Sequence, residues 1–125
     1  MTGITPKETP TMCFHEPTDR KYAAHLRRAA PDMQKAYAAL GEAVFKGDGT
    51  VPAKYRELIA IGVAVTTQCP FCIDSHTRAA VDAGATPEEL GEAVMVAAAL
   101  RAGGAVTHGF QVMKTAQDAA AATAS

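Results

Sequence analysis

The stretch LIAIGVAVTTQCPFCIDSH, which spans residues 58–76, joins an apolar segment to two closely spaced cysteines. Residues 58–65 are apolar on every side of a helix, and a helix that is hydrophobic all round is a buried one. We therefore expect a helix over about residues 52–67 at the centre of the fold. Pro70 suits a first helical position and Gly84 suits a helix end, so a second helix is expected between them.

Further helices are predicted on both sides of this pair. On the N-terminal side, residues 18–29 and then, restarted by a proline, residues 31–46 are expected to be helical. On the C-terminal side, Thr86, Pro87 and Glu89 form a capping box with a proline at the first helical position. This is the strongest helix-start signal in the chain.

The paired glycines Gly103 and Gly104 are expected to end that helix, and one more helix is expected after them. No segment shows the alternation that is typical of a strand. The sequence therefore predicts an all-α fold of about six helices, in one domain over residues 18–118. Residues 1–17 are expected to form an extended arm, and residues 119–125 a frayed tail.

The composition limits the classes of function. Of the 125 residues, 48% are hydrophobic and 20% are charged, which is typical of an ordered chain. Lys and Arg number 12 against 13 Asp and Glu, so no basic surplus is present to neutralise the phosphates of a nucleic acid. The polar N-terminus does not resemble a signal peptide, and residues 58–65 are far shorter than the ~20 apolar residues of a membrane helix. We expect a cytoplasmic protein, without membrane association and with reduced thiols.

The two cysteines carry the most specific chemical signal. Because Pro70 takes the first helical position, Cys69 is expected to cap the helix and Cys72 to lie in its first turn. The unpaired N–H groups and the positive end of the helix dipole at that point stabilise a thiolate. His76 lies one turn further on the same face, where an imidazole can accept the thiol proton.

Other interpretations of this motif stay open from the residues alone. Cys69, Cys72 and His76 would supply three ligands of a zinc site that structures a non-catalytic module. The fourth ligand would have to come from isolated candidates, namely Cys13, His15, His108 or Glu57. The two cysteines could also be inert helical residues. A thioredoxin domain shares the spacing but needs strands around it, which are not expected here.

Three segments in order resemble the alkylhydroperoxidase D-like branch of the carboxymuconolactone decarboxylase family. They read RELIA at residues 56–60, CPFCIDSHTRAA at residues 69–80 and AGATPEEL at residues 83–90. The resemblance extends over roughly residues 40–109. It implies an all-α fold, which agrees with the helix pattern.

The resemblance also implies a thiol peroxidase or disulfide reductase that needs no metal, flavin or haem. Cys72 would be the thiolate that attacks a small hydroperoxide, and Cys69 would resolve the resulting sulfenic acid into a disulfide. His76 and Glu57 would form the proton relay, and an external dithiol or disulfide-reductase partner would restore the thiols. The decarboxylase branch of the family, whose members usually lack the cysteine pair, is the alternative activity.

Helix geometry alone does not predict a direct contact between Glu57 and His76. In an antiparallel hairpin the two residues would be offset by about 6 Å along helices that pack about 8–10 Å apart. A bridging water is the expected connection. The alternative is that Glu57 is an ordinary surface residue near a helix start.

Short Ala-rich helices supply few large side chains for a core, so we expect a homo-oligomer, and the resemblance implies a trimer or hexamer. The arm at residues 1–17 could lie across a neighbouring subunit. The helix face expected to meet another subunit consists of Val94, Val96, Ala97, Ala98 and Leu100.

The remaining reactive or aromatic residues give weaker signals. His108 could approach the thiols from the last helix, although packing or exposure is the commoner outcome. We expect His15 and His25 at the surface, Cys13 as a spare thiol and Tyr55 in the core.

Overall fold

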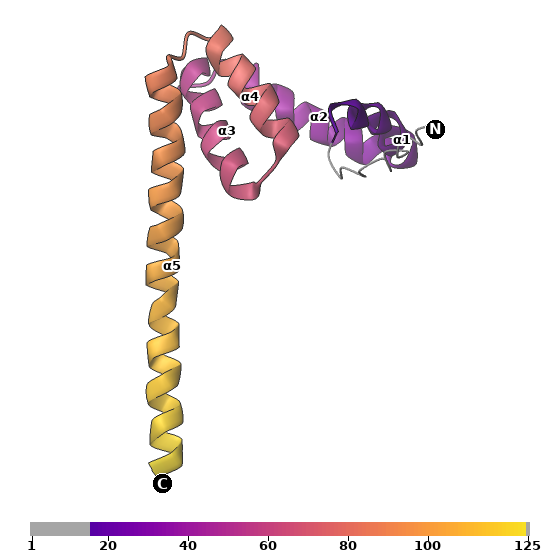
Figure 1. Ribbon diagram of the computed structural model, residues 1–125. Helices are drawn as coiled ribbons and strands as arrows, with labels where there is room; N and C mark the ends of the chain where they lie inside the picture. The colour runs from indigo at the N-terminus through magenta and orange to yellow at the C-terminus, as the bar shows by residue number, and fades with distance from the viewer. Residues whose placement is uncertain (1–15, 125) are drawn as a thin grey trace, which may run out of the picture. The chain divides into compact units, whose positions relative to one another are not determined.

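The computed structural model describes residues 16–124, which fall into two compact units with the boundary in the sequence between Leu40 and Gly41. Within these residues every regular element is helical, so the all-α prediction is confirmed, with five α-helices and one short 3-10 helix in place of about six helices. In chain order (Figure 1) the elements are η1 (Pro17–Tyr22), α1 (Ala23–Ala29), α2 (Pro31–Phe45), α3 (Ala53–Thr67), α4 (Pro70–Asp82) and α5 (Pro87–Ala124).

The predicted helix end at Gly103 and Gly104 is wrong, because α5 is one helix of 38 residues that runs to Ala124. A glycine inside a helix costs about 1 kcal/mol relative to alanine, which weakens a helix without ending it. The hydroxyl of Thr107 donates hydrogen bonds to the carbonyls of Gly103 (3.0 Å) and Gly104 (3.2 Å). The turn that contains both glycines therefore remains helical.

Helix α3 is the centre of the second unit, as the sequence predicts, since it packs against both α4 and α5 (Figure 1). Its buried residues include Ile61 and Ala64, and the small residues Ala80 of α4 and Ala97 of α5 are buried as well. A Cβ atom added to Gly62 would lie 3.8 Å from the Cβ of Ala97. Small residues thus allow α5 to approach α3 closely, and Ala97 packs within its own chain.

The prediction that α3 is buried on all sides is wrong within one chain. Ile59 is 60% exposed and Val63 is 56% exposed. The reason is that α4 and α5 cover only part of the circumference of α3. Tyr55 is likewise 48% exposed instead of lying in the core, and the ammonium group of Lys54 lies 5.1 Å from the centre of its ring.

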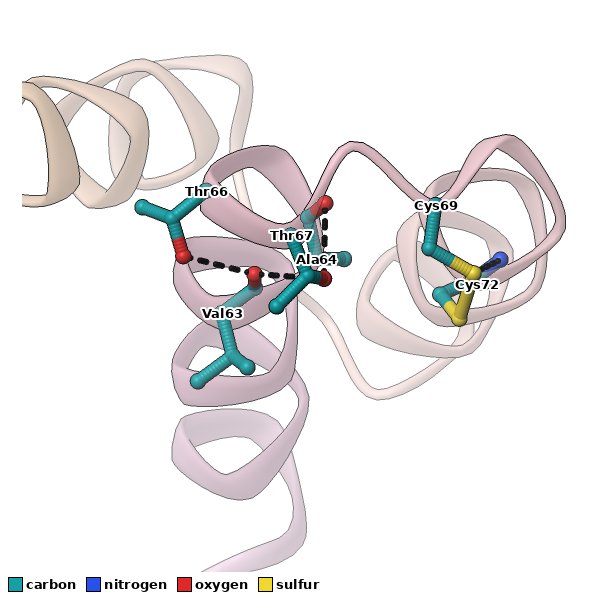
Figure 2. Close-up of a disulfide and its surroundings, with 6 residues drawn as sticks. All are labelled: Val63, Ala64, Thr66, Thr67, Cys69 and Cys72. Carbon is teal, nitrogen blue, oxygen red and sulfur yellow. Dashed lines mark hydrogen bonds between the residues drawn. A yellow bond between two sulfur atoms is a disulfide. The ribbon is translucent and has the colours of Figure 1, made fainter.

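The turn between α3 and α4 takes only two residues. Gln68 adopts the left-handed conformation (φ 55°, ψ 48°), which ends α3. The amides of Gln68 and Cys69 both donate to the carbonyl of Ala64. The hydroxyl of Thr67 donates to the carbonyl of Val63 (3.0 Å, Figure 2). Because these terminal carbonyls have partners, the chain can reverse at once and place Cys69 at the start of α4.

The predicted capping box at the start of α5 is confirmed. The Thr86 amide donates to Glu89 Oε2 (2.9 Å), and the Glu89 amide donates to Thr86 Oγ1 (3.2 Å). Lys54 of α3 donates to Glu89 Oε1 (2.8 Å). That hydrogen bond lowers the pKa of Glu89 and raises the pKa of Lys54. The pair therefore fastens the first turn of α5 to the first turn of α3.

Most of α5 carries apolar side chains that remain exposed. By length and composition, it is the one helix within residues 16–124 that could cross a membrane, and none of its most apolar 18-residue window is buried. The core helices of soluble proteins pass the same test, so this finding is weak evidence of a span. The large exposed apolar side chains of α5 are Val94, Met95, Val96, Leu100, Val106, Phe110, Val112 and Met113.

Replacing Thr86 with alanine is expected to lower the free energy of unfolding by about 1 kcal/mol, because the Glu89 amide loses its acceptor. Urea denaturation followed by circular dichroism measures this change. Thr115→Ala is the matched control, because Thr115 is exposed within the same helix and alanine favours helix there. Equal midpoints for Thr86→Ala and the unsubstituted protein would contradict the assignment of the cap.

Candidate active site

Cys69 and Cys72 lie where the sequence predicts, at the start of α4. Cys69 is the N-cap residue, and its sulfur accepts a hydrogen bond from the Cys72 amide (3.3 Å). The two sulfurs form a disulfide, with the Cα atoms 5.3 Å apart (Figure 2). The oxidised state of the pair thus fits within one helical turn.

His76 is in direct contact with Glu57, contrary to the prediction of a bridging water. Nδ1 of His76 lies 2.6 Å from Oε2 of Glu57. The offset of about 6 Å expected along the helix axes took account of the backbone rise alone. The long side chain of Glu57 and the imidazole of His76 span that offset. Because a carboxylate accepts hydrogen bonds, this contact places the proton on Nδ1 and leaves Nε2 as an acceptor.

Glu57 is a buried residue, only 9% exposed, so the alternative of an ordinary surface glutamate is wrong. Taking a carboxylate out of water is unfavourable unless it is paired and hydrogen-bonded. The imidazole of His76 supplies that partner. The pairing of Glu57 with His76 therefore holds α3 and α4 in a fixed position relative to each other beside the two cysteines.

Phe45, the last residue of α2, covers the imidazole. The ring centroids of Phe45 and His76 lie 4.6 Å apart, at a tilt of 37°. Sequence analysis gave Phe45 no place in the site. His76 is thus restrained by a carboxylate at Nδ1 and by an aromatic ring beside it.

A mainly apolar cavity of about 340 Å³ adjoins the thiols. Cys72 and His76 both line it, whereas Cys69 does not. Of the two cysteines, Cys72 is therefore the one that a ligand in the cavity would contact. The cavity is lined by Val44, Phe45, Arg56, Ile59, Ala60, Val63, Ala64, Thr67, Cys72 and His76.

Arg56 is a second residue of the site to which sequence analysis gave no role. Its Nε donates to the carbonyl of Val51, and its Nη1 donates to the carbonyl of Val44, both at 2.8 Å. It therefore fastens the last turn of α2 and the following loop to α3. The sequence contained Arg56 beside Glu57, but no local pattern indicates contacts made across a loop.

The other candidate residues lie elsewhere. His108 is exposed on α5 and does not line the cavity. His25 lies beside Tyr22 in the first unit, with ring centroids 5.7 Å apart. Cys13 and His15 lie outside the described residues. Within residues 16–124, no three His, Cys, Asp or Glu side chains gather in a way that could hold a metal ion.

Comparisons with known proteins identify a family and a relative that this chain resembles. The sequence model of the carboxymuconolactone decarboxylase family matches residues 31–115, which include the whole site. A Paracoccus denitrificans protein, described as uncharacterized protein 4 in the cox locus, is 44% identical over 81 residues, covering 65% of this chain and 72% of the relative.

Two solved structures are similar in fold. One is a carboxymuconolactone decarboxylase family protein from Legionella pneumophila, with 35% identity and a TM-score of 0.60 over 66% of this chain and 73% of that one. The other is a protein from Methanobacterium thermoautotrophicum, with 30% identity and a TM-score of 0.65 over 73% of this chain and 98% of that one.

Phe45→Leu is expected to remove the ring current that acts on the His76 imidazole protons and to cost about 1 kcal/mol of stability. Proton NMR of the imidazole and urea denaturation measure the two effects. Tyr37→Leu is the control, because Tyr37 is an aromatic residue of the same helix and is 70% exposed. Identical imidazole shifts in the unsubstituted protein and Phe45→Leu would contradict the stacking.

Proposed function

The chain belongs to the carboxymuconolactone decarboxylase family, and from that premise we propose that it is a thiol-dependent hydroperoxide reductase. The observation that carries the proposal is the Cys69–Cys72 disulfide at a helix start, with Cys72 facing an apolar cavity beside a Glu57–His76 pair. The chain would act as an oxidoreductase that alternates between the dithiol and this disulfide.

The first step consumes the hydroperoxide. Nε2 of His76 takes the proton of the Cys72 thiol, and the thiolate attacks the terminal oxygen of ROOH. A sulfur–oxygen bond forms as the oxygen–oxygen bond breaks. The alkoxide then takes the proton from the imidazolium, which leaves ROH and a Cys72 sulfenic acid.

The second step forms the disulfide. The Cys69 sulfur attacks the Cys72 sulfur, and the departing hydroxide leaves as water with the proton from Cys69. ROOH and two thiols have then become ROH, water and one disulfide. An external dithiol, either a small molecule or a disulfide-reductase partner, returns the pair to the reduced state.

Glu57 would position the base and stabilise it when it is charged. Its carboxylate holds Nδ1, which leaves Nε2 as the nitrogen available to the thiol. A carboxylate beside an imidazolium also lowers the energy of the charged intermediate. The half-buried surroundings of the pair, with side chains 12% and 25% exposed, strengthen that interaction.

The two alternative functions have less support. A decarboxylase of a lactone with two carboxylates would need cationic or hydrogen-bonding side chains for both, whereas Arg56 is the one permanent cation in the cavity lining. A zinc-structured module would need a fourth ligand, and Glu57, one of the candidates, is already bonded to His76. Neither alternative makes use of the disulfide.

A homo-oligomer, a trimer or hexamer in keeping with the family resemblance, is part of the proposal. Helix α5 extends well beyond α3 and α4 (Figure 1), and the apolar face formed by its large exposed side chains needs a cover in water. Other copies of the chain would supply it. With that face covered by protein, a cytoplasmic location without membrane association is consistent with the long apolar helix.

In the Cys13→Ser protein, one equivalent of cumene hydroperoxide is expected to remove both remaining thiols, as counted with a chromogenic disulfide. In the Cys13→Ser, Cys69→Ser protein the reaction should stop at a sulfenic acid that a dimedone-type reagent traps. Cys13→Ser, Cys72→Ser is the control and should keep its single thiol. Survival of both thiols in the Cys13→Ser protein would exclude the proposed reaction.

Light scattering at micromolar concentration is expected to report at least three chains per particle. Phe110→Glu should dissociate the assembly, because it places a charge on the exposed apolar face. Gln111→Glu is the matched control at the adjacent exposed position. A monomeric unsubstituted protein would show that α5 has no such partner.

A further inference from the structure

The cavity beside Cys72 contains a permanent positive charge that the proposed chemistry does not use. Apart from Arg56, the side chains that line it are apolar or, for Thr67, Cys72 and His76, neutral or titratable. A hydroperoxide group and a thiol react without a guanidinium. The presence of Arg56 in an otherwise apolar wall is therefore a separate observation about the ligand.

The charge of Arg56 is not balanced by a carboxylate in the described part of the chain. Its two bonds go to the neutral carbonyls of Val44 and Val51. By contrast, Lys46, Lys54 and Arg78 each form an ion pair with a glutamate or aspartate. Glu57, which adjoins Arg56 in the sequence, does not line the cavity and is bonded to His76.

The guanidinium is also held in place and retains donors for a ligand. It has five N–H groups, of which the bonds to Val44 and Val51 use two. Gly49 lies against it, since a Cβ added there would be 3.5 Å from Cζ of Arg56. A fixed guanidinium loses little entropy when it binds, and its planar fork can bind a carboxylate through two parallel hydrogen bonds.

We propose that the cavity selects organic hydroperoxides that carry a carboxylate, which Arg56 binds. This inference rests on the proposed function, because it names the substrate class of the same site. Arg56 and Cys72 line one cavity, so a single ligand can contact both. Its apolar body would lie against Ile59 and Val63, which line the same wall and are otherwise exposed.

A matched pair of substrates tests the inference. Cumene hydroperoxide with a para-carboxylate and the methyl ester of that acid differ only in the charged group. The rate of thiol loss is measured for each in the reduced Cys13→Ser protein. The acid is expected to react at least about tenfold faster than the ester, which corresponds to the lower end of the free energy of one hydrogen bond to a charged group. This acid-to-ester ratio should fall as the ionic strength rises.

Three arginine variants assign the effect to the residue. In Arg56→Gln the acid-to-ester ratio should fall to about one, and in Arg56→Lys it should be intermediate, because the charge remains without the fork. Arg78→Gln is the control, since Arg78 is exposed, pairs with Asp74 and does not line the cavity. The ratio within each variant cancels any general loss of folding or activity.

The outcomes separate this inference from the proposed function. A ratio near one in the unsubstituted protein, with both substrates oxidising the thiols, overturns the carboxylate preference and leaves the reductase proposal standing. A ratio that persists in Arg56→Gln overturns the assignment to Arg56. Failure of both substrates to oxidise the thiols overturns the reductase proposal and the inference with it.

Discussion

Burying the Glu57 carboxylate between helices is unfavourable unless a donor meets it, and the imidazole of His76 on α4 is that donor. The contact joins residues 19 positions apart, across the turn that contains Cys69. A shift of α4 along α3 by one turn, about 5.4 Å, would break the bond and leave a charge unpaired. The register of the hairpin and the placement of the thiols therefore depend on this one pair.

The same hairpin explains why so little of the chain is buried. Three of the buried residues are the small residues Ala64, Ala80 and Ala97, and Gly62 lies against Ala97; such residues allow close approach of helices but bury little area. Larger apolar residues are left exposed on faces that no helix within residues 16–124 covers. A chain that packs closely along α3 and leaves large apolar side chains exposed elsewhere is the expected result of such a sequence.

Local signals in the sequence predicted local structure well. The proline at the start of α4, the N-cap at Cys69 and the capping box at Thr86 each act within one turn, and all are present. The helix end predicted at Gly103 and Gly104 was wrong because glycine weakens a helix without ending it, and α5 continues through both residues.

Contacts between distant segments were not predictable in the same way. The bond between Glu57 and His76 depended on side-chain reach, which counting helical rise leaves out. Phe45 and Arg56 entered the site through a contact and two hydrogen bonds that span the loop after α2. Hydrophobic periodicity can place a residue such as Phe45 on an apolar helix face, but it does not show which side chain that face meets.

Arg56 lines the cavity and also holds the end of α2, which contains the aromatic ring that lies against His76. Its bond to the Val44 carbonyl fixes the last turn of α2, and the next residue, Phe45, is the ring that covers His76. The bonds to backbone use Nε and Nη1, so an anion bound through the remaining N–H groups need not displace them. Substrate recognition at Arg56 and positioning of the base by Phe45 are thus compatible, and loss of the guanidinium would disturb both. For this reason the comparison of acid with ester inside each variant, and not the activity of the variant itself, separates the two roles.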